Sequence, residues 1–298
     1  MARVLEYKGK NEDAGRTVRD VMNSEFGLVA HDISRAKYRK DGIMLDGEHV
    51  WVNRVMMPGQ VLRVVIEDSP SGKIIPAEGK LEIVYEDEDV IAVNKPAGIV
   101  VHPSHGHYTD SLGNILAWYM REKGDEHEIR SVGRLDKDTS GLILFGKNRT
   151  AVSKLVEQAD SGVRSKEYLA LAAGKFAAAS GMINLPVGRI SEGSVKRGVR
   201  EDGDSAQTCF YVLRQFDDSA LLCIRLITGR THQIRVHMAY TGHPLLGDSL
   251  YGYGEYEGLE RAALHSHRIC FRQPFTGKEI HLEAPVPEDM KNVIEGHM

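Results

Sequence analysis

The chain has 298 residues, 42% hydrophobic and 27% charged, which fits one large globular domain or a large and a small one. Its net charge of −4 excludes a global basic field, so any site for a nucleic acid must be local. The three cysteines lack metal-ligand spacing, and neither a signal peptide nor a run of about 18 apolar residues occurs, so we expect a cytoplasmic protein without a membrane span.

The first 68 residues predict a small mixed unit. Apolar side chains at roughly helical spacing predict a helix over residues 17–27, and a second helix should begin at a Ser34 cap and end at Gly42. Residues 43–53 are typical of two strands joined by an Asp-Gly turn, and residues 60–68 of another strand.

Residues 69–80 contain two prolines, two glycines and two serines, which is typical of a linker. We therefore predict a domain over residues 1–68, a linker over 69–80 and a second domain over 81–298.

The second domain mixes hairpins and helices without regular alternation. The expected elements are a hairpin over 81–98, a helix over 110–123, a buried strand over 141–147, a helix capped by Asn148, and strands over 163–174, 206–216 and 220–228. This order predicts an α+β fold with a mixed, largely antiparallel sheet.

The stretch "GRLDKDTSGLILFGKN", residues 133–148, places many polar groups before an apolar strand. One interpretation is a turn whose Asp and Ser side chains bond their own backbone. The other is a reactive carboxylate between cations. Arg134 and Asp136 are two residues apart and point the same way in an extended segment, and nucleophilic catalysis requires an ionised carboxylate.

A second stretch, residues 228–248, offers further cations. Its polar side chains are Arg230, His232, Arg235 and His237. They are either solvated charges at a sheet edge or partners of the carboxylate. Strand-like alternation would place Arg235 and His237 on one face and apolar residues on the other, and the spacing alone does not decide between these interpretations.

Two other polar groups allow a functional interpretation. His102, His105 and His107 suggest a metal site, but no carboxylate or cysteine follows at ligand spacing, so a loop is the better interpretation and we expect no metal. Residues 34–40 contain four cations, either a solvated face or a site that grips phosphates: Arg35, Lys37, Arg39 and Lys40.

Four blocks together closely resemble the RluA-type family of pseudouridine synthases in type, order and approximate spacing. These blocks are "NKPAGIVVHP", "GRLDKDTSGLILFGKN", "SKEYLALAAG" and "TGRTHQIRVHMAYTGHPLLGD". The resemblance covers about residues 80–285. Residues 13–67 resemble, more loosely, the alpha-L RNA-binding domain, which supports the phosphate-gripping interpretation of residues 34–40.

The resemblance implies roles for individual residues. Asp136 matches the catalytic aspartate, Tyr168 the active-site tyrosine and Arg235 the arginine that pairs with the aspartate. Arg134 matches an arginine that helps to displace the target base, and we expect Arg230 and His232 to join it in binding substrate. Many members have His where this chain has Gly133, which puts in doubt any role assigned to that histidine.

The implied activity is the isomerisation of specific uridines to pseudouridine in structured RNA. The glycosidic bond is cut and remade at carbon 5 of the base, and because nothing is oxidised and nothing leaves, no cofactor is needed. We expect a monomer that acts on large-subunit ribosomal RNA. The alternatives are a transfer-RNA-specific synthase, a non-catalytic RNA-binding or ribosome-assembly factor on the same scaffold, and a metal hydrolase that uses the histidines.

Overall fold

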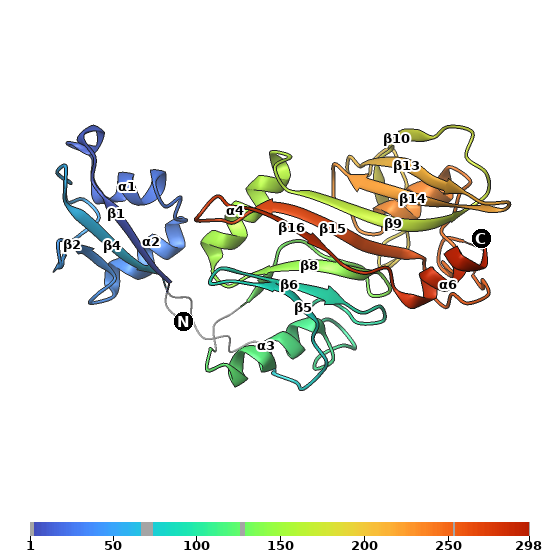
Figure 1. Cartoon of the computed structure of the whole chain (residues 1–298), viewed down its shortest axis with the longest axis horizontal. Helices are drawn as coiled ribbons and strands as arrows, with labels where there is room; N and C mark the ends of the chain where they lie inside the picture. Colours follow the sequence, from blue (N-terminus) through green and yellow to red (C-terminus); the bar gives the residue numbers. More distant parts are fainter. Residues whose placement is uncertain (1–2, 67–73, 126–128, 253, 298) are drawn as a thin grey trace.

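The computed structural model describes residues 3–66, 74–125, 129–252 and 254–297. Residues 3–66 form a small four-stranded sheet with two α-helices, and the remainder is built around a ten-stranded sheet (Figure 1). No helix among these residues has the length and apolar character to cross a membrane.

The N-terminal unit is an antiparallel sheet covered by short helices. Its elements are β1 (Arg3–Lys8), a 3-10 helix η1 (Asn11–Asp13), α1 (Val18–Ser24), α2 (Ala30–Tyr38), β2 (Ile43–Leu45), β3 (Glu48–His49) and β4 (Val61–Ile66), with strand order β1-β4-β2-β3. Thr17 caps α1 in a reciprocal pair with Asp20. Val21 and Met22 of α1 are buried in one core with Leu62 of β4.

The second helix begins earlier than the sequence suggested. The predicted start at Ser34 is wrong, because α2 begins at Ala30 after the extended residue Val29 and Ser34 lies inside it. The helix starts there because it buries Ile33 and Ala36 against the sheet, and this packing outweighs the capping preference of Ser34. It ends at Tyr38, since Arg39 is extended.

Among the residues that the structure describes, the large sheet is antiparallel except for one pair of strands. Its path runs β10 (Ser180–Asn184), β13 (Gln207–Gln215), β14 (Ser219–Leu226), β9 (Ser165–Ala173), β15 (Leu264–Arg272), β8 (Ser140–Gly146), β6 (Val90–Lys95) and β5 (Ile83–Glu86). β16 (Glu279–Glu283) pairs with β15, β7 (Arg130–Ser131) pairs with β8, and β11 (Val187–Arg189) and β12 (Arg197–Val199) form a separate ribbon. The parallel pair is β8 with β15, so the predicted α+β fold with a largely antiparallel sheet is confirmed.

Helices cover both faces of this sheet. They are α3 (Leu112–Glu122), α4 (Arg149–Asp160), α5 (Gln233–Tyr240) and α6 (Glu288–Gly296). Alternate residues of β6 face opposite sides of the sheet. Ile91 therefore packs in the hydrophobic cluster that contains Leu116 of α3, and Val90 packs in the cluster that contains Leu155 of α4. Asn148 caps α4 by accepting from the amide of Ala151, as predicted.

The parallel contact between β8 and β15 depends on Gly141. Its φ is +101°, and a Cβ there would lie 2.2 Å from the carbonyl oxygen of Ser266. Only glycine permits this approach, which starts β8 directly after the loop that carries Asp136 and sets that loop beside β15.

The N-terminal unit contacts the large domain at the start of α4. The buried carboxylate of Asp32 accepts hydrogen bonds from the amide and the hydroxyl of Thr150, at 3.1 and 2.5 Å. Phe275, in the turn between β15 and β16, packs against the N-terminal core, and the ammonium of Lys154 lies 4.6 Å from the centre of its ring. These contacts hold α2 beside α4 (Figure 1).

The predicted linker over 69–80 falls in part on residues 69–73, which lie outside the described residues. Residues 74–80 have no helix or strand. The carbonyl oxygen of Ile75 accepts from the side-chain amide of Asn114 at 2.7 Å, and the amide of Ala77 donates to the carbonyl oxygen of Asn114 at 3.1 Å. This second half of the segment is therefore attached to α3.

Candidate active site

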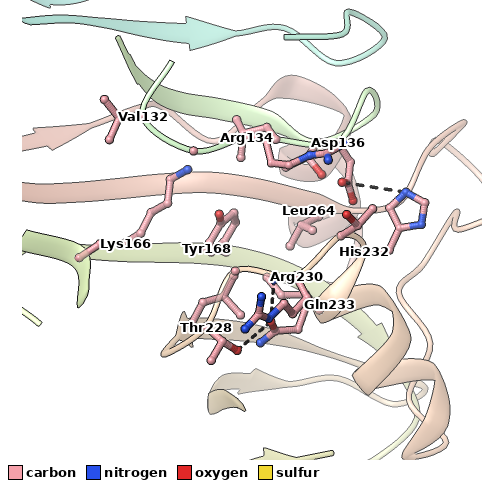
Figure 2. A pocket seen from close by; sticks show the side chains of 18 of the residues that line it. Val132, Arg134, Asp136, Lys166, Tyr168, Thr228, Arg230, His232, Gln233 and Leu264 are labelled. Carbon is pink, nitrogen blue, oxygen red and sulfur yellow. Dashed lines mark hydrogen bonds and ion pairs between the residues drawn. The ribbon is translucent and has the colours of Figure 1, made fainter. Parts of the chain in front are cut away.

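A pocket of about 520 Å³ opens where the loop after β7, strand β9 and the segment from β14 to α5 meet. The structure brings together there all six residues predicted for catalysis and substrate binding: Arg134, Asp136, Tyr168, Arg230, His232 and Arg235. Figure 2 shows Asp136 and His232 facing one another across the space above Tyr168 and Arg230. The volume is in the range of small-ligand sites.

The loop that carries Asp136 is fixed from behind by a buried lysine. The ammonium of Lys95 donates to the carbonyl oxygens of Lys137, Pro96 and Ile99, at 2.9, 2.9 and 2.8 Å. Burial lowers the pKa of Lys95 to about 7, while three acceptors favour the charged form because only the ammonium has three N–H donors. Sequence reasoning missed this residue, although a lysine at the end of an apolar strand was a visible signal.

The backbone before Asp136 requires glycine. Gly133 has a φ of +89°, a region that residues with a Cβ rarely adopt. The hydroxyl of Ser131 donates to the carbonyl oxygen of Gly133 at 2.7 Å, and it lies 2.6 Å from Nε2 of His102. A histidine at position 133 would therefore strain this loop. The side chain of Arg134, which follows, is exposed at the rim of the pocket.

The Asp136 carboxylate is flanked by two basic side chains but accepts no hydrogen bond from any described residue. Its Oδ2 lies 3.8 Å from Nη1 of Arg235, and its Oδ1 lies 4.0 Å from Nε2 of His232. The aspartate side chain is only 15% exposed. It therefore combines an attractive cationic environment with lone pairs that are free to react.

Arg235 is held mainly by a second carboxylate that sequence reasoning missed. Its Nε and Nη2 donate to the two oxygens of Asp248, both at 2.7 Å. Asp248 also accepts from the backbone amides of Leu250 and Tyr251. A bidentate pair of this kind fixes the plane of the guanidinium, which leaves Nη1 directed at Asp136. Asp248 is the last residue of the 228–248 stretch, but spacing gave no reason to single it out.

The strand-like alternation expected for Arg235 and His237 is wrong, because these residues lie on helix α5. His232 adopts a left-handed conformation with φ of 58° directly before the helix, at the end of the loop that follows β14. His237 is buried away from the pocket, between the hydroxyl of Thr208 and the carbonyl oxygen of Leu185. Arg235 and His237 therefore have separate surroundings.

Tyr251 orients the imidazole of His232. Its hydroxyl lies 2.8 Å from Nδ1 and accepts the backbone N–H of Arg197 at 2.7 Å. If the hydroxyl donates its own proton to Nδ1, the ring proton is on Nε2 and faces Asp136. Burial lowers the pKa of His232, although the charge of Asp136 opposes this, so the neutral ring is favoured at pH 7.

Gln233 shapes the loop that presents Arg230. Its side-chain oxygen Oε1 accepts from the backbone amide of Arg230 and from the hydroxyl of Thr228, both at 2.9 Å (Figure 2). The side-chain nitrogen Nε2 of Gln233 donates to the backbone carbonyl oxygen of Gln207 and to the hydroxyl of Thr208, both on β13. These bonds anchor the loop to the sheet. The guanidinium of Arg230 in turn donates to the carbonyl oxygen of Ser205 at 3.1 Å.

Strand β9 supplies an aromatic wall and a lysine. Burial, together with the negative charge of Asp136, raises the pKa of Tyr168, so its phenol stays neutral. The ammonium of Lys166 lies 5.3 Å from the centre of the Tyr168 ring. Burial lowers the pKa of Lys166 to about 7, with a further contribution from Arg164.

The pocket carries more basic than acidic side chains. Of the described residues that line it, Asp136 is the one acid, against five side chains of Arg and Lys. The pocket therefore attracts anions despite the acidic chain.

The four cations of residues 34–40 lie on the N-terminal unit and do not line this pocket. Lys37 lies over the rings of Tyr38 and Trp51, and Arg39 pairs with Asp41 at 2.6 Å. In the part of the chain that the structure describes, no group of three His, Cys, Asp or Glu residues is arranged to hold a metal ion.

The family model for RNA pseudouridylate synthase matches residues 89–240. A ribosomal large subunit pseudouridine synthase D from Vibrio vulnificus is 36% identical, over 99% of this chain and 95% of its own. An uncharacterized RNA pseudouridine synthase from Bacillus subtilis is 37% identical, over 91% and 96%. The solved structure of human RNA pseudouridylate synthase domain containing 4 has a TM-score of 0.60 at 22% identity, covering 72% of this chain and 92% of its own, and this likeness concerns the fold.

Proposed function

Because the chain belongs to the RNA pseudouridylate synthase family, we propose that it isomerises specific uridines of large-subunit ribosomal RNA with Asp136 as the nucleophile. Family membership makes the chain an isomerase that converts uridine to pseudouridine in RNA, as the motifs predicted. The identity of the RNA and the roles of the residues are the proposal.

The reaction detaches the uracil ring from the sugar at nitrogen 1 and reattaches it through carbon 5. Carbon 5 loses a proton and nitrogen 1 gains one, so atoms and electrons balance without an external reactant. The enzyme must supply a nucleophile, hold the detached base in place and move a proton.

One observation carries the assignment of Asp136. Its carboxylate lies within 4.0 Å of Arg235 and His232 but is engaged in no hydrogen bond among the described residues. Arg235 gives the carboxylate an attractive cationic neighbour, and free lone pairs allow it to attack the target nucleoside. Arg235 holds the Asp136 carboxylate in position and stabilises its negative charge before it attacks and again when it is released from the nucleoside.

The remaining pocket residues serve the extruded nucleotide. Taking a base out of an RNA stack costs a few kcal/mol, which an inserted cation and an aromatic surface offset. Arg134, exposed at the rim, takes the place of the displaced base, and the ring of Tyr168 forms the wall against which the uracil packs. Arg230 and His232 bind the nucleotide at the opposite wall.

The choice of ribosomal RNA rests on the Vibrio relative, which aligns over nearly the whole chain, N-terminal unit included. That unit carries Arg35, Lys37, Arg39 and Lys40, which we assign to phosphate contacts. Such contacts position an RNA without reading its bases.

The test is conversion of defined RNAs by the purified protein. Large-subunit ribosomal RNA and transfer RNA, both transcribed without modification, are incubated with the wild type and with Asp136→Asn, and pseudouridine is mapped. We expect sites in the ribosomal RNA for the wild type and none for the variant, which should bind RNA normally. Conversion of transfer RNA alone would contradict the ribosomal substrate and show that the protein is a transfer-RNA-specific synthase. Activity of Asp136→Asn within about tenfold of wild type, or ~1.4 kcal/mol of barrier, would contradict the nucleophile assignment.

A further inference from the structure

Two large aromatic side chains stand side by side on the surface of the N-terminal unit. Tyr38, the last residue of α2, is 75% exposed, and Trp51, which follows β3, is 51% exposed. Their ring centres are 6.4 Å apart and nearly perpendicular, and His49 meets Trp51 edge-on at 5.7 Å. We call these three residues the aromatic platform.

The platform does not contribute to the hydrophobic core of its own unit. That core is formed by other residues of α1, α2 and the sheet, and the platform rings are absent from it. Strand β2, whose hairpin partner carries His49, lies on the side of the unit that faces away from α4 (Figure 1). Grouped aromatic side chains in water mark an interaction site, because each exposes apolar area that burial would stabilise.

A cation is part of the same cluster. The ammonium of Lys37 lies 5.1 Å from the ring centre of Tyr38 and 5.3 Å from that of Trp51. Residues 34–40 add three more basic side chains on the same helix end. An aromatic face beside clustered positive charge matches a nucleotide, which has a flat base and an anionic phosphate.

We propose that the aromatic platform stacks an unpaired base of the RNA substrate, while Lys37 contacts an adjacent phosphate. The base is unpaired, because a base within a duplex has no free face for a ring. The inference rests on the RNA substrate of the proposed function, and it gives the N-terminal unit a preference for single-stranded loops or bulges. It adds base stacking to the phosphate contacts assigned above.

Fluorescence of Trp51 reports this contact directly. The chain has two tryptophans, so Trp118→Phe leaves Trp51 as the single reporter in the full-length protein. A short single-stranded oligouridylate should quench its emission. A duplex of the same length and an abasic strand with the same number of phosphates should quench it much less. Equal quenching by all three would overturn the proposal, because charge alone would then explain binding.

Affinity measurements separate stacking from charge. Trp51→Ala should weaken binding of the oligouridylate about 5- to 150-fold, equivalent to about 1–3 kcal/mol for one stacked base, and Trp51→Phe should retain most of it. Trp51→Ala should leave the log–log salt slope unchanged, whereas Lys37→Gln should make it shallower by about 0.7. Tyr211→Ala, which removes a 44% exposed tyrosine from β13, is the matched control and should bind normally.

The outcomes distinguish this inference from the proposed function. Absence of pseudouridine formation by the wild type would refute the substrate, whatever the platform does. If the wild type is active and Trp51→Ala remains folded and binds RNA like the control, the platform does not bind RNA. Self-association that disappears in Trp51→Ala would then assign the patch to a second copy of the chain, which also contradicts the proposal.

Discussion

Arg235 binds Asp248 through two hydrogen bonds of 2.7 Å, while its nearest approach to Asp136 is 3.8 Å. The guanidinium thus reaches the carboxylate of Asp136 from a fixed position set by a buried partner, Asp248. The arginine that was expected to pair with Asp136 does lie beside it, and it also binds a second carboxylate, that of Asp248. The carboxylate of Asp248 therefore compensates the cost of burying Arg235, and Asp136 does not have to do so through hydrogen bonds of its own.

Asp248→Asn should lower both stability and activity. The substitution leaves the guanidinium of Arg235 buried without its hydrogen-bonded counter-charge, and breaking a buried pair in this way typically costs about 3–5 kcal/mol of unfolding free energy. The exposed pair of Arg200 and Asp202 provides the control, because Asp202→Asn should leave the stability nearly unchanged. Urea denaturation and single-turnover rates measure the two effects. A stable but inactive variant would show that Asp248 acts on the chemistry and contributes little to folding.

The sequence predicted the six pocket residues but not the partners that hold them. Asp136 and Tyr168 could be identified because their local blocks are distinctive. Asp248 and Lys95 could not, because their partners depend on how loops far from one another pack, and neither spacing nor periodicity encodes this. Lys95 donates to a loop more than forty residues away in the chain.

The same distinction applies to the fold. Apolar runs and turn residues predicted the antiparallel sheet, because the pattern that marks each strand lies within a few neighbouring residues. The helix α5 was mistaken for an extended segment, because its buried arginine and histidine conceal the helical periodicity and every residue from Gln233 to Met238 is buried. The start of α2 was misplaced because packing of Ile33 outweighed the local cap signal.

Tyr168→Phe should reduce the single-turnover rate by less than about 100-fold, the lower end of what general acid–base catalysis contributes. Burial and Asp136 raise the pKa of the phenol, which makes it a poor base near neutral pH. The shape of the pH–rate profile between about pH 6 and 9 should be the same in both proteins, and Tyr168→Ala should be slower still because it removes the ring. A rate reduction well above 100-fold, with one limb of the profile missing in Tyr168→Phe, would assign proton transfer to the hydroxyl.

Glu86 should contribute stability that is lost in acid. Burial raises the pKa of this carboxyl, but hydrogen bonds from Lys123, Lys147 and Tyr119 outweigh burial and lower it to about 2, from an ordinary value of 4.5. The depressed folded-state pKa means that the contribution is complete above pH 4.5 and disappears as the pH falls toward 2. We expect about 1–3 kcal/mol, allowing for screening at the half-exposed Lys123.

Glu86→Gln should therefore flatten the fall in unfolding free energy between about pH 5 and 2. The matched control is Glu279→Gln, since Glu279 pairs with Arg272 on the surface and is 65% exposed. Urea denaturation at several pH values measures the slope for each variant. An acid dependence identical to that of the wild type would mean that the Glu86 pairs do not stabilise the fold.

Removal of the N-terminal unit should weaken RNA binding more than it slows the chemistry. A chain that begins at Ile74 keeps every residue that lines the pocket, and it keeps the hydrogen bonds of Ile75 and Ala77 to Asn114. One that begins at Gly79 lacks those two bonds and should be less stable. Both lack the hydrogen bonds between Asp32 and Thr150 and uncover Phe275, so some decrease in stability is expected in each.

The salt dependence of affinity identifies what the unit contributes. Removing one phosphate-binding side chain should make the log–log salt slope shallower by about 0.7–0.9, and full-length Lys40→Gln tests this for a single cation. At saturating RNA, the single-turnover rate of the chain that begins at Ile74 should stay within about tenfold of wild type, because cations that bind phosphates position an RNA without reacting with it. An unchanged slope would show that residues 34–40 do not bind phosphates. A shortened protein that is folded yet inactive at saturation would show that the packing of α2 against α4 shapes the pocket, since α4 supplies Ala159 to its lining.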